Sequence, residues 1–130
     1  MKKFAKILSV AMLVVMTALV MTACVPSSAE KAVEKLEKAG YETEVYTDAD
    51  EIGKEMLGFV HEDAVAMLMG GKEDNSIAVV WLDNKDAAKE LYDKTYEELK
   101  DEIEEGVDVV VKRKGKVVYY GTEQGVKDFE

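Results

Sequence analysis

The stretch Ala64–Leu82, AVAMLMGGKEDNSIAVVWL, decides the fold. Two apolar runs, residues 64–69 and 77–82, flank the glycine-containing polar segment 70–75. Short apolar runs on either side of such a segment predict a β-hairpin. Apolar side chains stand at nearly every position of both strands, so both faces of the hairpin are expected to be covered.

The segment after this hairpin predicts the longest helix of the chain. Asp83 and Asn84 are suited to cap its beginning, and it is expected to run to about Glu105, before Gly106. Apolar residues recur along it at helical spacing and predict one buried stripe, which consists of Ala88, Leu91, Tyr92, Leu99 and Ile103.

Two further elements are expected between the long helix and the end of the chain. The apolar runs 107–111 and 117–120 predict a second hairpin. Thr122 is suited to cap a short final helix that carries Val126 and Phe129.

The segment before the central hairpin predicts two helices and one strand. Ser27 has capping-box spacing to a glutamate, and the helix after it is expected to end at Gly40. Apolar and polar residues alternate over Tyr41–Thr47, which predicts a half-buried strand. A short helix capped by Asp48 should follow and end at Gly58.

The predicted order of elements gives the expected fold class, α+β. Over residues 41–111 this order is β-α-β-β-α-β, which is that of a ferredoxin-like fold with an antiparallel sheet and helices on one face. An added edge strand and N- and C-terminal helices would complete the domain. Helices on one face alone would leave the second apolar face of the central hairpin to be covered by something else.

The first 24 residues have the layout of a targeting segment. Lys2, Lys3 and Lys6 precede an apolar run over 7–21, which ends in Met21-Thr22-Ala23-Cys24. This segment resembles a bacterial lipoprotein signal peptide with its lipobox, although Met21 stands where leucine is usual. The resemblance implies cleavage before Cys24 and attachment of a diacylglycerol to its thiol, with further fatty acids such as palmitate.

The resemblance also implies a location, the outer side of the cytoplasmic or the outer membrane. The remainder of the chain resembles small uncharacterised bacterial lipoproteins, mainly through VYYGTE at 118–123. Two alternatives stay open for the first residues. The run Phe4–Ala23 approaches the ~20 residues of a permanent helical anchor, and an ordinary secretory signal would be cleaved after Ala23, although the large Met21 suits such a site poorly.

Length and charge limit the class of protein. We expect a signal peptide over 1–23, a lipid-anchored linker over 24–28 and a single domain over 29–130, with no disulfide because Cys24 is the only cysteine. Three of the 17 basic residues and none of the 27 acidic residues precede Cys24, which leaves 14 against 27 and a net charge of −13. Such a charge disfavours nucleic acid as a partner.

The sequence predicts no metal site and no cofactor. Asp48, Asp50 and Gly53 match three positions of an EF-hand loop, but Ile52 and Phe59 occupy positions that require ligands. His61 is the only histidine, so a zinc site of several histidines or cysteines is not expected. A Ser-His-acid triad is not excluded by counting, but no nucleophile elbow surrounds the one serine, at position 76, that follows residue 28.

Two charged clusters have open interpretations. Lysines and one arginine over 112–116 could contact a membrane or an acidic partner, or they could protect an edge strand. Carboxylates at 101, 102, 104 and 105 crowd the end of the long helix, where the helix dipole disfavours them. They predict either a frayed, solvated turn or a site for a cation or a basic partner.

The resulting functional hypothesis is a membrane-tethered, non-enzymatic binding or protein-interaction domain. The alternative is an envelope hydrolase or transferase with a carboxylate site formed by Glu42, Glu44 and Asp50. The best candidate for an interaction face is the apolar hairpin face assigned to Met67, Met69, Val79 and Trp81. It would meet a second protomer or another envelope protein, unless one of the end helices covers it.

Overall fold

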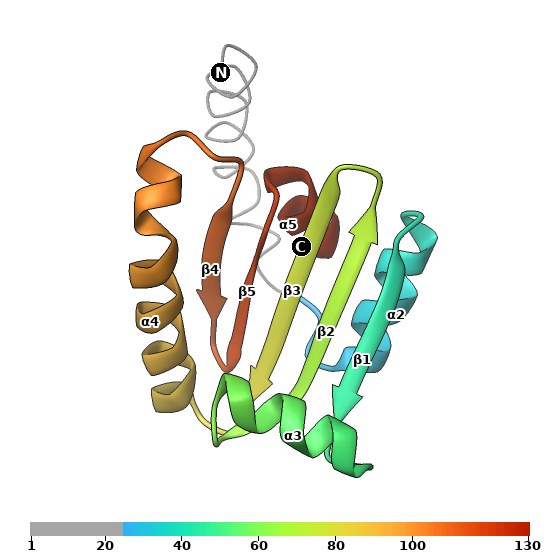
Figure 1. The fold of residues 1–130 in the computed structure, drawn as a ribbon. Coiled ribbons are helices and arrows are strands. Elements are labelled where there is room, and N and C mark those ends of the chain that lie inside the picture. Colours follow the sequence, from blue (N-terminus) through green and yellow to red (C-terminus); the bar gives the residue numbers. More distant parts are fainter. Residues whose placement is uncertain (1–24) are drawn as a thin grey trace.

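The predicted central hairpin forms the middle of a five-stranded antiparallel sheet in the computed structural model, which describes residues 25–130 (Figure 1). The strand order is β1-β2-β3-β5-β4. The elements are, in chain order, α2 (Ala29–Lys38), β1 (Glu42–Thr47), α3 (Glu51–Val60), β2 (Ala64–Lys72), β3 (Asn75–Leu82), α4 (Lys85–Glu104), β4 (Val110–Lys114), β5 (Val117–Gly121) and α5 (Glu123–Phe129). The mixed α+β class is therefore confirmed.

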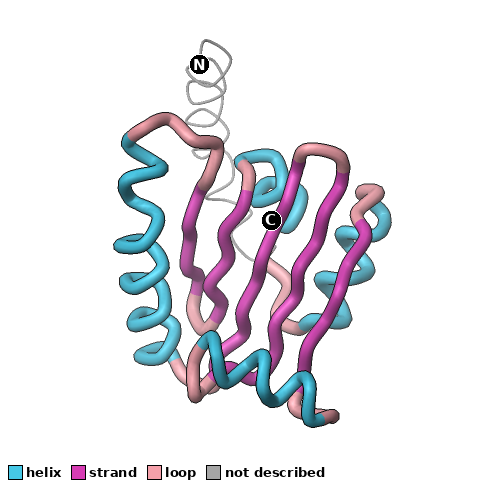
Figure 2. The backbone as a smooth tube through the Cα atoms, in the orientation of Figure 1, coloured by secondary structure: helices cyan, strands magenta, loops and turns pink. Residues whose placement is uncertain are grey.

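The strand order differs from the predicted ferredoxin-like order, in which strands joined by a helix do not pair with each other. Here β1 pairs directly with β2, although α3 joins them. The helix has 10 residues, and it lies across the end of the sheet rather than along it (Figure 2). It is only ~15 Å long, so the chain enters β2 at the end where it left β1.

The longer helix α4 makes the other connection differently. Its 20 residues span ~30 Å and carry the chain back along the strands (Figure 1). Both β3 and β4 are antiparallel to β5, so β4 runs parallel to β3 with β5 between them. Helix length thus decides which connected strands become neighbours.

Helices cover both faces of the sheet, so the prediction of helices on one face was wrong. Helices α2 and α5 pack on one face, which we call the α2/α5 face, and α3 and α4 pack on the other, the α3/α4 face. The core on the first face contains Ala32, Leu36, Tyr41, Leu68, Ile77, Val79, Trp81, Val117, Tyr119, Val126 and Phe129. The core on the second contains Leu57, Met67, Val80, Leu82, Ala87, Ala88, Leu91 and Val118.

The four residues predicted to share one interaction face lie on two. Met67 is paired with Val80 and belongs to the α3/α4 face, whereas Val79 and Trp81 belong to the α2/α5 face. Met69 follows Met67 by two positions and so lies on the same face. The physical reason is the turn, because pairing of Lys72 with Asn75 places odd-numbered residues of β2 opposite even-numbered residues of β3.

Trp81 is covered by the chain itself, as the simpler interpretation of this face predicted. Its ring packs edge-on against Phe129 of α5, with the centroids 6.4 Å apart. The indole nitrogen donates a hydrogen bond to the carbonyl oxygen of Pro26 at 3.1 Å. Val25 packs on the same core and Pro26 is buried, so the described part of the predicted linker belongs to the fold.

Two helix caps lie later than predicted. Ser28 rather than Ser27 caps α2, because its hydroxyl accepts a hydrogen bond from the backbone N–H of Lys31. Asp50 rather than Asp48 caps α3 and accepts from the backbone N–H of Gly53 at 2.6 Å. The helix α3 also passes through Gly58 and ends at Val60. The caps predicted at Asn84 and Thr122 are confirmed.

Candidate functional site

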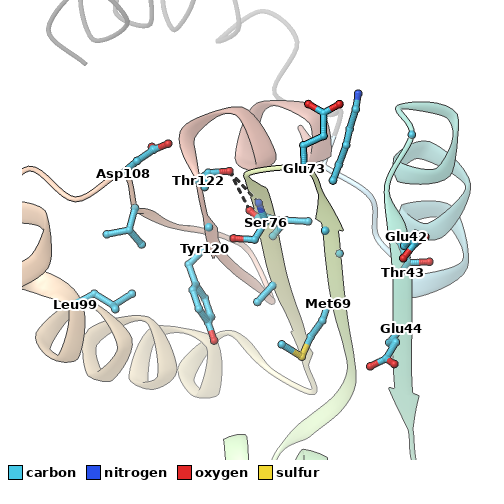
Figure 3. A pocket seen from close by; sticks show the side chains of 18 residues that line it. Glu42, Thr43, Glu44, Met69, Glu73, Ser76, Leu99, Asp108, Tyr120 and Thr122 are labelled. Atoms are coloured by element: carbon cyan, nitrogen blue, oxygen red, sulfur yellow. Dashed lines mark hydrogen bonds between the residues drawn. The ribbon is translucent and has the colours of Figure 1, made fainter. Parts of the chain in front are cut away.

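A groove of about 1040 Å³ lies over the sheet at the end remote from α3. We call it the acidic groove. Figure 3 shows Met69 between Leu99 and Tyr120 on one side and Glu42 and Glu44 on the other. Its lining comprises Gly40, Glu42, Thr43, Glu44, Met69, Gly70, Gly71, Lys72, Glu73, Ser76, Ile77, Ala78, Leu99, Asp108, Val109, Tyr120, Gly121 and Thr122.

The groove exists because the helices on the α3/α4 face do not reach this area. α3 packs on β1 and β2 near one end of the sheet, and α4 packs over β3, β4 and β5. The nine residues of β2 extend ~30 Å, and α3, which lies across the strands, covers only the end where β2 begins. The residues of β2 and β3 on this stretch are small or flexible, namely Met69, Gly71, Ser76 and Ala78.

The floor of the groove is apolar and open to solvent. Met69 is 47% exposed, whereas Met67, two residues earlier on the same face, is 6% exposed under the helices. Leu99 of α4, predicted as part of the buried stripe, is half-buried at the groove wall. The predicted stripe is therefore fully buried only in its first half, with Ala88 and Leu91 in the core.

The charged residues of the groove are nearly all acidic. Glu42 and Glu44 come from the edge strand β1, Glu73 from the β2–β3 turn and Asp108 from the segment before β4. Two of these carboxylates have hydrogen-bond partners. Glu44 accepts from the Tyr46 hydroxyl at 2.9 Å, and Asp108 accepts from a backbone N–H at the start of α5 at 3.0 Å.

Lys72 is the one basic residue of the lining, and its charge is engaged elsewhere. Its ammonium group donates a hydrogen bond to the carbonyl oxygen of Ala39 at 2.6 Å. The same group lies 5.8 Å from the centre of the Tyr41 ring, which belongs to the core of the α2/α5 face. Among the described residues, the groove carboxylates therefore have no ion pair with a lysine or arginine of the lining.

Tyr120 brings a hydroxyl group to the groove wall. Burial raises the pKa of this phenol, and the carboxylate of Glu98 on α4 raises it further. The hydroxyl therefore keeps its proton to a higher pH than an ordinary tyrosine does and remains a hydrogen-bond donor. Sequence reasoning missed Tyr120 and Asp108, because it did not predict that β5 lies beside β3. It assigned Glu73 only to the turn between β2 and β3.

The carboxylates proposed for an enzyme site do not come together. Glu42 and Glu44 lie two residues apart on β1 and line the acidic groove. Asp50 caps α3 beyond the other end of that strand, with its carboxylate on the backbone N–H of Gly53. The structure thus brings together two of the three predicted residues and adds Glu73 and Asp108.

The remaining charged candidates have local roles in the described residues. His61 caps the C-terminal end of α3. Its Nδ1 accepts a hydrogen bond from the backbone N–H of Asp63, and its Nε2 lies 3.7 Å from a carboxylate oxygen of Glu90. In the basic segment 112–116, Lys112 pairs with Glu130 at 3.0 Å. No group of three or more His, Cys, Asp or Glu side chains within residues 25–130 is placed to hold a metal ion.

The predicted targeting segment comes before the first described residue, Val25. Cys24 and the signal peptide over 1–23 lie outside the described residues. In the part that is described, none of the helices has the length and apolar character needed to cross a membrane. Comparisons with family models, with curated proteins and with solved structures gave no match.

Proposed function

We propose that the protein is an extracytoplasmic lipoprotein, anchored through Cys24, and that its folded domain is a binding module. Support for the anchor comes from the lipobox-like sequence at 21–24. Support for the binding role comes from the acidic groove, which combines an exposed apolar floor at Met69 with carboxylates on both sides. This groove is the observation on which the proposal rests.

The chemistry of the groove selects a positively charged partner with apolar side chains. Glu42, Glu44 and Glu73 take part in none of the ion pairs of the described residues, so a bound cation would not have to displace one. Charge complementarity of this kind speeds encounter and excludes acidic competitors. An extended or helical segment with lysine or arginine beside aliphatic residues would place its apolar side chains on Met69 and its charges on the rim.

The edge strand β1 adds a second feature suited to such a segment. Among the described residues β1 pairs with one strand, β2. The backbone N–H and C=O groups on its other side therefore have no strand partner there. Exposed edges of this kind can accept a further strand from a partner. Glu42 and Glu44 also discourage indiscriminate pairing at this edge, because charged side chains on edge strands oppose aggregation.

The methionine methyl groups provide a test of the groove. We would titrate the full-length, membrane-purified protein in detergent with a peptide of alternating lysine and leucine, and follow the methyl resonances. Met69 should shift in a saturable way, while Met56 and the buried Met67 serve as internal controls. The same peptide with glutamate in place of lysine should produce no shift.

The double variant Glu42→Gln/Glu44→Gln should weaken this titration several-fold, because it removes two rim charges without changing side-chain size. Equal shifts at all three methionines, or no shift at Met69, would contradict the groove proposal. The anchor is tested separately by mass spectrometry of membrane-derived protein. An unmodified Cys24 in that sample would refute the lipoprotein proposal, whatever the groove binds.

A further inference from the structure

The residue that follows Cys24 is held firmly against one end of the sheet. Val25 packs on the core of the α2/α5 face, and Pro26 accepts a buried hydrogen bond from the Trp81 indole nitrogen at 3.1 Å. One residue of extended chain spans at most ~3.6 Å. A lipid on Cys24, as proposed above, would therefore keep the surface around Val25 close to the bilayer.

The same end of the sheet carries the most exposed large apolar side chains of the described residues. α3 crosses this end, beside the C-terminal end of β3 and the β4–β5 turn (Figure 1). Phe59 is 84% exposed and Ile52 is 71% exposed. They stand seven residues apart and so share one side of the helix, while Leu57 on the other side is 4% exposed in the core.

A small pocket lies beside Val25 at the same end of the sheet. It has a volume of about 390 Å³, and its lining includes Val25, Val65, Trp81, Val117, Lys114 and Lys116. Val65 is 46% exposed because the register of β2 against β3 shifts between Ala64 and Ala66. Exposed apolar residues of α3 and of β2 thus lie at the same end of the sheet as Val25, and large apolar surfaces that remain exposed mark interaction sites.

Charge alone does not define the occupant of this surface. Lys114 and Lys116 border the pocket, but Asp63 and Asp83 lie in the adjoining connections and are joined by a backbone hydrogen bond of 2.9 Å. The charges beside the pocket therefore offset one another, and Glu51, Lys54 and Glu55 on α3 add a net negative charge. An anionic surface is not selected over a neutral one, and apolar contact must supply the interaction.

We propose that this end of the domain, with Phe59, Ile52 and Val65, lies on the bilayer that holds Cys24. The inference rests on the lipid anchor proposed above. Apolar side chains would enter the boundary between headgroups and acyl chains, as they do in other interfacial segments. The acidic groove, at the opposite end of the sheet, would then face away from the membrane and toward a partner.

The test uses the full-length, lipidated protein in phosphatidylcholine vesicles with a nitroxide label at one introduced cysteine. The variant Phe59→Cys reports on the proposed contact, and its high exposure means that the substitution leaves the core unchanged. Val107→Cys is the control, because Val107 is 45% exposed and lies between α4 and β4, at the other end of the sheet.

The label at residue 59 should be protected several-fold from an aqueous nickel complex and accessible to oxygen, whereas the label at 107 should be open to nickel. Equal nickel access at both positions, in protein shown to be lipidated and vesicle-bound, would overturn the membrane contact and leave the anchor intact. Protection that requires phosphatidylglycerol and vanishes at high salt would overturn the apolar contact. An unmodified Cys24 would remove the anchor and this inference together.

Discussion

The two faces of the sheet are covered to very different extents. On the α2/α5 face, the two end helices bury Leu68, Val79 and Trp81 along most of the strand length. On the α3/α4 face, burial stops beyond Met67, and Met69 is left in the acidic groove. The comparison shows that one face of this hairpin serves stability, whereas part of the other remains available for binding.

Alanine substitutions of Phe129, which is buried, and Phe59, which is exposed, should differ most in their effect on stability. Phe129 is 0% exposed and packs against Tyr119 at a ring distance of 4.9 Å, so Phe129→Ala should lower the free energy of unfolding by ~3–5 kcal/mol. Phe59→Ala removes the same ring from an exposed site and should change it by no more than about 0.5 kcal/mol. Urea titrations followed by circular dichroism measure both, and similar losses would show that the assignment of the core is wrong.

Leu68 and Met69 are adjacent in β2 and lie on opposite faces of the sheet, so substitutions of these two residues compare the two faces. Leu68→Ala should cost ~2–5 kcal/mol, because Leu68 is 0% exposed under α2 and a cavity would remain. Met69→Ala should cost about 1 kcal/mol or less, since the side chain is half exposed and gains little from burial. The same unfolding assay tests the pair, and a larger loss for Met69→Ala would mean that the groove is filled in solution.

Two glycines of α3 test how tightly this helix is seated on the α3/α4 face. A methyl group at Gly53 would collide with the backbone carbonyl of Thr47, so Gly53→Ala should destabilise the fold by ~1–3 kcal/mol. A methyl group at Gly58 meets nothing within 4 Å, so Gly58→Ala should stabilise the helix by up to ~1 kcal/mol. Melting temperatures that move in the same direction for both variants would contradict this seating.

The smallest expected effect concerns how the stability of the fold declines at alkaline pH, through a tyrosine on the α2/α5 face. The Tyr119 hydroxyl donates to Glu130 at 2.7 Å, and burial, followed by this hydrogen bond, raises its pKa well above the usual value. An unfolded tyrosine releases its proton near pH ~10 while the folded one keeps it, so stability is retained below that pH and falls as the pH rises above it.

Tyr119→Phe should cost ~1 kcal/mol at neutral pH, through loss of one hydrogen bond, and should make the decline above pH ~10 shallower. Unfolding curves collected at several alkaline pH values measure this slope. An unchanged slope in the variant would show that the Tyr119–Glu130 pair does not carry the effect.

The local elements followed from the sequence because their signals are local. The polar segment between two apolar runs predicted the central hairpin, and Asn84 and Thr122 predicted two caps correctly. The caps at Ser27 and Asp48 were misplaced because Ser28 and Asp50 have the same chemistry one or two residues later. Neighbouring residues with equal capping ability cannot be separated by pattern alone.

The acidic groove was not predicted from the sequence. Met69, Glu42 and Glu44 were singled out, but for different sites, and Glu73, Asp108 and Tyr120 were not identified. These residues meet only because β5 lies beside β3 and because no helix covers this part of the sheet. Neither the pairing of β5 with β3 nor the uncovered part of the sheet can be predicted from the sequence of a single segment.

By itself, the sequence determined the α+β class, the two hairpins, the need to cover both faces of the central hairpin, and the acidic charge. The tertiary structure alone decided the strand order, the face on which each apolar residue lies and the position of the groove. The reason is that strand pairing joins distant segments, and a shift of one residue in the β2–β3 turn exchanges the two faces. Helix length had a similar effect, since α3 was too short to return the chain and so placed β2 beside β1.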